Sequence, residues 1–265
     1  HGLELTAVQM SAGRMKEALA TIAVMRRLPP PLGDDPRLDL AEAEAYSQLG
    51  DAALLERAAT RALHNAELLG ATTIALRARL LLAWRLFLLG EYERCVQQLE
   101  QLRGVAVTLG EPALMIELLH TLMSANAQLD ELGAAVALGE EAVREATRLG
   151  NHELTADLQG NLAALLFRLG RLEDAGRAQA RTTLASPSNQ INGQVLRGQI
   201  AAARGEIAEA GVAYEASLQR LRALDDERMI AWVQALRGEV AIEADRLDEA
   251  EGLVRESLAA RERLG

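Results

Sequence analysis

The chain has 265 residues, of which 49% are hydrophobic and 25% charged, a composition that supports a sizeable buried core and disfavours disorder. Its formal net charge of −10 argues against a surface that grips phosphate backbones, so we expect no direct nucleic-acid binding by this segment. The one cysteine, Cys95, excludes an internal disulfide and favours a reducing, cytoplasmic compartment. The longest apolar run, residues 80–89, is interrupted by Arg85 and is too short for a membrane span.

Apolar residues recur three or four positions apart along most of the chain, and runs of β-branched residues are absent, so we expect helices and no strands. A proline-rich loop at 29–36 and the segment Ser186-Pro187-Ser188-Asn189 interrupt this pattern. In chain order, the expected helices cover residues 3–12, 15–28, 37–49, 51–69, 71–89, 91–109, 112–128, 131–149, 151–169, 171–185, 190–204, 206–224, 226–244 and 246–264.

Turn residues between these helices recur at a fixed spacing. Gly50, Gly90, Asp130 and Gly170 follow one another at intervals of 40, and each comes directly after a leucine. Glycine, and less often aspartate, accepts the left-handed conformation that ends a helix. A fixed period in this range predicts a solenoid of helix pairs. The expected turns within pairs are Gly13, Gly50, Gly90, Asp130, Gly170, Gly205 and Asp245.

The residues after these turns carry a family resemblance. Gly170-Arg171-Leu172-Glu173-Asp174-Ala175 places a small residue five positions after the turn, as do the segments 13–18, 205–210 and 245–250, and Cys95 takes that place after Gly90. In this pattern the chain resembles the tetratricopeptide repeats. The resemblance implies an all-α, right-handed solenoid of about seven helix pairs within one domain. Because the chain stops at Leu264-Gly265, in the same phase as Leu149-Gly150, we expect the domain to be excised from a longer protein. The units are residues 1–28, 37–70, 71–110, 111–150, 151–185, 189–224 and 225–265.

Sequence signals for catalysis and for metal or cofactor binding are missing. The chain has no phosphate-binding loop and no nucleophile elbow, and its four histidines lack second ligands at metal-binding spacing. Cys95 occupies a position at which the repeat needs a small buried residue, which favours packing over a role as nucleophile. We therefore expect a protein that is not an enzyme and needs neither metal nor cofactor.

The resemblance implies that the first helices of successive units line a binding groove. Trp84 and Phe87 form the sharpest candidate, an aromatic anchor with polar neighbours, although both could instead pack between helices. Asn161 matches a position that contacts bound peptides in many such repeats, with structural use as the alternative, and His120 is an isolated histidine. The expected ligand-binding residues are Arg77, Leu80, Trp84, Phe87, His120, Ser124, Gln128, Asn161 and Arg168.

These observations indicate a binding scaffold for a peptide, a protein or a small-molecule effector. The 40-residue period and the recurring Arg-Leu-Gly ends resemble the sensor region of large ATP-dependent transcriptional activators of the maltose-activator type. The alternative is a free-standing adaptor for assembling protein complexes. Terminal helices without polar caps leave self-association open as a further contact.

Overall fold

The computed structural model describes residues 1–264 and is helical throughout apart from short turns and loops. No strand occurs within that range, so the predicted all-α class is confirmed. The helices are α1 (Gly2–Ser11), α2 (Met15–Met25), α3 (Pro36–Leu49), α4 (Ala52–Leu68), α5 (Thr72–Leu88), α6 (Tyr92–Leu109), α7 (Pro112–Gln128), α8 (Leu132–Arg148), α9 (His152–Arg168), α10 (Leu172–Gln179), α11 (Pro187–Ala203), α12 (Ile207–Ala223), α13 (Glu227–Glu243) and α14 (Leu247–Leu264).

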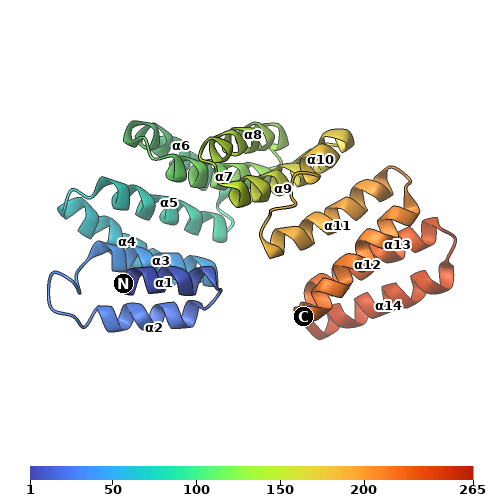
Figure 1. The fold of residues 1–265 in the computed structure, drawn as a ribbon, viewed down its shortest axis with the longest axis horizontal. Helices are drawn as coiled ribbons and strands as arrows, with labels where there is room; N and C mark the ends of the chain where they lie inside the picture. Colours follow the sequence, from blue (N-terminus) through green and yellow to red (C-terminus); the bar gives the residue numbers. More distant parts are fainter. Residues whose placement is uncertain (265) are drawn as a thin grey trace. The chain divides into compact units, whose positions relative to one another are not determined.

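The helices form two compact units, residues 1–138 and 139–265, and α8 crosses the division. Within each unit, helices adjacent in sequence pack against each other as successive pairs, for example α3 on α4 and α13 on α14 (Figure 1). First helices also contact the first helices of the next pair, as α3 does with α5 and α9 with α11. This is the solenoid of helix pairs that the periodicity predicts, in the tetratricopeptide-like form that the family resemblance implies.

Each expected turn ends its helix in the left-handed conformation. Gly90 and Gly170 have φ values of +76° and +73°, and even Asp130 and Asp245 are held at +62° and +58°. At Gly90, the amide of Glu91 donates to the carbonyl of Leu86 at 2.9 Å and the amide of Gly90 donates to that of Phe87 at 3.0 Å. This pair of bonds is the Schellman motif, which satisfies carbonyls that the helix end would otherwise leave free.

The small residue five positions after the turn is buried in every unit for which the sequence predicts it. Because such a side chain projects little beyond its own backbone, the two helices of a pair can approach closely there. The exposed fractions are 0% for Ala18, Cys95, Ala175 and Ala210, and 4% for Ala250.

A close approach of another kind fixes α11 against α12. The ring of Tyr214, which is only 2% exposed, lies so near Gly198 that a Cβ atom there would fall 2.4 Å from Cε1. Only glycine fits at that position. The Tyr214 ring thereby reaches the core of the C-terminal unit, where it packs with Val195, Leu218 and Val233.

The structure corrects three predicted boundaries. The second helix ends at Met25 and not at residue 28, α10 ends at Gln179 and not at 185, and α11 begins at Pro187 and not at 190. The hydroxyl and the amide of Thr182 both donate to the carbonyl of Gln179, at 2.7 and 3.1 Å, which closes α10 early. Proline lacks an amide hydrogen that the first helical turn would leave unbonded anyway, so α11 can start at Pro187.

We expect Ala175→Leu to lower the free energy of unfolding by about 1–3 kcal/mol, because the added atoms overpack a fully buried site between α9 and α10. Urea denaturation followed by circular dichroism measures the change. Ala164→Leu makes the same substitution at an exposed position of α9 and should change stability by less than about 0.5 kcal/mol. Equal stability of the two variants would contradict the register of the repeat.

Candidate functional site

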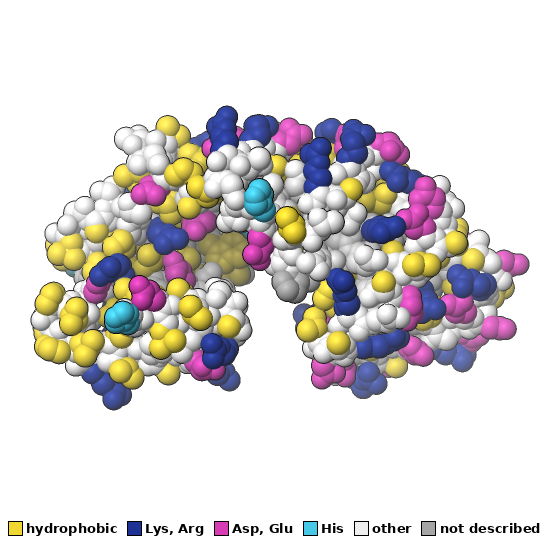
Figure 2. Space-filling model, viewed as in Figure 1, with side chains coloured by type: hydrophobic (Ala, Val, Ile, Leu, Met, Phe, Trp, Pro, Cys, Tyr) yellow, Lys and Arg dark blue, Asp and Glu magenta, His cyan; other side chains and the backbone are white. Residues whose placement is uncertain are grey.

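A hollow of about 460 Å³ lies on the N-terminal unit, over the first helices of three successive pairs. We call it the α3–α5–α7 hollow. It is lined by Glu44, Ser47, Gln48, Arg77, Leu80, Leu81, Trp84, Glu117, His120 and Thr121. Figure 2 shows hydrophobic, acidic and basic side chains close together on the visible face of this unit.

The 40-residue period explains why these residues meet. Glu44 and Trp84 are separated by one period, as are Arg77 and Glu117, so each pair occupies the same position on successive first helices. Since α3 contacts α5 and α5 contacts α7, equivalent positions come together side by side. The repeat therefore brings equivalent positions of the first helices together into one surface. The residue type at each position determines the chemical character of that surface.

Trp84 is held by aromatic neighbours and by the core. Its ring stacks on that of Phe87, with centroids 4.6 Å apart and planes 10° from parallel, and Phe87 in turn meets Tyr92 edge-on at 5.3 Å. Trp84 also packs against the buried cluster that includes Leu55. The alternative of packing between helices is therefore present, and the role of Trp84 as a binding anchor stays a prediction. The half-buried indole packs between helices and also lines the hollow.

Phe87 does not line the hollow. Its ring stacks on that of Trp84, and this contact lowers the conformational entropy that the indole would lose on binding.

The hollow contains two carboxylates and one guanidinium. Arg77 donates from Nη2 to Oε1 of Glu117 at 3.3 Å, but these side chains are 39% and 51% exposed, so water screens the pair. Glu44 is half-buried, and its pKa is raised by burial first of all; Arg77 opposes this rise and the charge of Glu117 adds to it. One guanidinium thus faces two acidic groups, which leaves an excess of negative charge beside Trp84.

The structure brings together four of the nine predicted binding residues, namely Arg77, Leu80, Trp84 and His120. The Ser124 hydroxyl donates to the carbonyl of His120 in its own helix at 2.9 Å. Gln128 is exposed at the last turn of α7 and lies outside the lining.

Asn161 and Arg168 lie on α9, in the C-terminal unit, and do not line this hollow. Both of them have interactions with other parts of the protein.

Three lining residues of α3 are absent from the predicted set. Glu44, Ser47 and Gln48 occupy, one period earlier, the positions of Trp84, Phe87 and Leu88. The signal that identifies all three is the repeat spacing, because each lies 40 residues before its equivalent on α5.

Other reactive groups offer little for catalysis. Cys95 is 0% exposed, and burial raises the pKa of its thiol to about 11, so it stays protonated at neutral pH and cannot act as a thiolate nucleophile. Within residues 1–264, no group of three or more His, Cys, Asp or Glu side chains is placed to hold a metal ion. None of the helices in this range is both long enough and apolar enough to cross a bilayer.

Comparison with known proteins supports the fold. A search for a matching protein family found none, and a search of curated proteins likewise found no match. Among solved structures, the apo form of RapI is similar over 99% of this chain and 97% of its own, with a TM-score of 0.68 and 11% identity. A Rap protein complexed with Competence and Sporulation Factor matches over 98% and 73%, with a TM-score of 0.72 and 11% identity.

A third similar structure is a signal transduction ATPase with numerous domains that has a tetratricopeptide repeat sensor, PH0952 from Pyrococcus horikoshii. It matches over 98% of this chain and 41% of its own, with a TM-score of 0.71 and 12% identity. At such identities the likeness establishes the fold alone, and that fold is the tetratricopeptide-like helical repeat.

Proposed function

We propose that this chain is a non-catalytic recognition module, and that the α3–α5–α7 hollow binds a segment of a partner protein through a basic side chain. The observation that carries the proposal is the position of Trp84 in a hollow with Glu44 and Glu117, whose two charges face the single guanidinium of Arg77. A lysine or arginine side chain complements both features, because its cation is attracted by the carboxylates and by the face of the indole.

The surroundings suit such a contact. An aromatic ring in a concave site with a few polar groups is typical of an anchor position in peptide recognition. Half-burial of Glu44 strengthens its attraction for a cation relative to a fully solvated carboxylate. The net charge of −10 would also speed the approach of a basic partner.

Two of the similar structures fit this proposal. The Rap protein was solved in complex with Competence and Sporulation Factor, and the Pyrococcus horikoshii protein joins a repeat sensor to an ATPase. Together with the 40-residue period and the Arg-Leu-Gly unit ends, they favour a sensor region within a larger transcriptional regulator. A free-standing adaptor would use the same hollow. Sequencing the gene on both sides of this segment separates the two, since the regulator requires a nucleotide-binding domain and a DNA-binding domain.

We expect peptides selected by panning a random library on the purified protein to contain lysine or arginine. Truncation of Trp84 to alanine should weaken binding of a selected peptide about thirtyfold, because it removes the anchor ring. Fluorescence anisotropy with the labelled peptide measures the affinity, and circular dichroism checks that helical content is retained.

Trp232→Ala is the matched control, because Trp232 is the other tryptophan, lies on α13 of the C-terminal unit and is 38% exposed. It should leave the affinity unchanged. Glu44→Gln removes a charge and keeps the shape, so it tests the site even if the loss of the Trp84 ring unfolds the protein. Full affinity in a folded Trp84→Ala protein, or in Glu44→Gln, would reject the site.

The raised pKa of Glu44 makes the proposed contact sensitive to pH. Below its pKa the carboxyl group is neutral and no longer attracts a cation, so affinity for the basic peptide should fall as the pH drops through that raised value. Arg77 lowers this pKa, so Arg77→Gln should move the loss of affinity to higher pH. Anisotropy titrations at constant ionic strength measure both effects.

Protonation of His120 would also repel a cation, so His120→Gln is measured alongside. The fall in affinity should persist in His120→Gln and disappear in Glu44→Gln. Parallel curves for the wild type and Glu44→Gln would mean that Glu44 is not the group responsible.

A further inference from the structure

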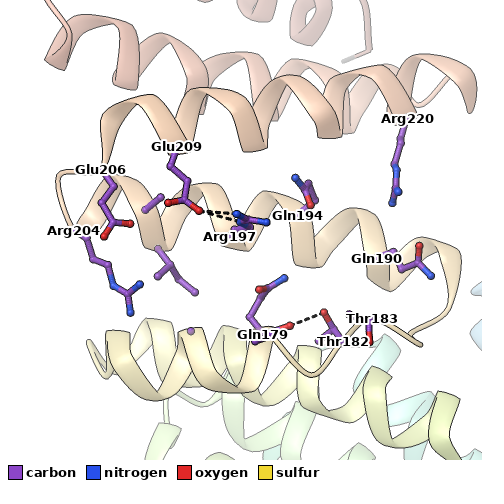
Figure 3. Close-up of a pocket in the computed structure, with 14 residues that line it drawn as sticks. Gln179, Thr182, Thr183, Gln190, Gln194, Arg197, Arg204, Glu206, Glu209 and Arg220 are labelled. Carbon is purple, nitrogen blue, oxygen red and sulfur yellow. Dashed lines mark hydrogen bonds and ion pairs between the residues drawn. The ribbon is translucent and has the colours of Figure 1, made fainter.

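A second hollow, of about 550 Å³, lies in the C-terminal unit between α10 and α12 and over α11 (Figure 3). We call it the α10–α12 hollow. It is separate from the first-helix surface because its walls are the second helices of their pairs. The side chains that matter here are Gln179, Thr183, Gln190, Gln194, Arg197 and Arg220.

The hollow coincides with the early end of α10. That helix has 8 residues, whereas α12 beside it has 17. The loop of residues 180–186 replaces the further turns that a full-length second helix would place beside α12. Polar side chains of α11 consequently line open space, and the volume falls within the range typical of small-molecule sites.

Comparable hollows lie elsewhere between second helices, and their arginines are all engaged. Between α4 and α6, Arg79 pairs with Glu67 at 2.8 Å, Arg85 with Glu56 at 2.9 Å, and Arg94 with Glu91. Between α12 and the start of α14, Arg237 and Arg246 both pair with Glu249, at 3.0 and 2.8 Å.

In the α10–α12 hollow, two of the three arginines are likewise engaged. Arg197 pairs with Glu209 at 2.7 Å, and Arg204 pairs with Glu173 at 3.0 Å. Arg220 differs, because it has no ion pair or hydrogen bond with any part of the chain that the structure describes. Figure 3 shows its side chain extending from α12 toward Gln190 on α11.

Two polar side chains near Arg220 also have hydrogen-bond donors that no protein group accepts. The Gln194 amide and the Thr183 hydroxyl make no hydrogen bond with any group that the structure describes. Gln179 and Gln190 donate to the carbonyls of Gly193 and Ala185, at 3.1 and 2.8 Å, which fixes their orientation. A ligand that enters here meets one uncommitted cation and several neutral donors.

We propose that the α10–α12 hollow binds a small organic molecule through a carboxylate group, with Arg220 as its ionic partner and Gln194 and Thr183 as hydrogen-bond donors. The planar guanidinium matches the two oxygens of a carboxylate. A phosphate dianion would need more than one free cation, and the acidic Glu206 and Glu209 line the same hollow, so a singly charged group fits better.

Saturation-transfer NMR with the singly charged carboxylates propionate, glycolate and benzoate as probes tests the proposal on the whole chain. At least one of them should show transfer from the protein, and Arg220→Gln should weaken its binding at least tenfold. Arg222→Gln is the matched control, because Arg222 lies two residues further along α12, pairs with Glu215 at 3.5 Å and does not line the hollow. It should bind as the wild type does.

Thr183→Val, which removes only a hydroxyl group, should weaken binding as well and keeps the test independent of the arginine. The proposal is overturned if none of the three carboxylates binds, if Arg220→Gln and Arg222→Gln behave alike, or if inorganic phosphate binds more tightly than every carboxylate. Circular dichroism of each variant confirms that the helices are intact. Because the basic-peptide site lies in the other unit, failure here leaves that test unaffected.

Discussion

Close approach of the two helices within each pair is the constraint on which the structure depends. Each pair has a turn residue in the left-handed conformation, as the positive φ values at the seven turns show. Five positions later, the small residues Ala18, Cys95, Ala175, Ala210 and Ala250 are completely or nearly completely buried, whereas Leu55 takes that place in the α3–α4 pair. The tight turn directs the two helices toward each other, and a small side chain lets their backbones approach more closely.

Once the pairs form, their repetition determines where chemistry can occur. Successive first helices present the same positions side by side, so a surface arises without any residue selected for it. Specificity then comes from differences between copies. One such position is Glu44 on α3, Trp84 on α5 and Ser124 on α7. An acid beside an aromatic ring favours a cation, and a third copy whose hydroxyl bonds within its own helix adds no competing charge.

A hollow also forms where the repeat is interrupted. Thr182 ends α10, and the space beside α12 is lined by polar groups.

In the N-terminal unit, a buried polar group instead connects neighbouring helices. Asp39, 3% exposed, accepts from Arg26 at 2.6 Å, from Arg61 at 3.0 Å and from Asn65 at 3.0 Å. That carboxylate joins the residue after α2 to α3 and α4, and its three hydrogen bonds offset the cost of burying its charge.

The sequence by itself determined the helices, the turns, the buried small residues and the inward position of Trp84, because all of these follow from local rules of spacing and backbone conformation. Glu44 follows from the same periodicity, because it lies one period before Trp84. Tertiary structure decided the rest. The early end of α10 depends on one threonine hydroxyl that competes with the helix. The role of Phe87 depends on its contact with Trp84, and the availability of Arg220 depends on having no described carboxylate within ion-pair distance. These features depend on contacts between residues that are distant in sequence. The spacing of a repeat does not specify which side chains on different helices come into contact.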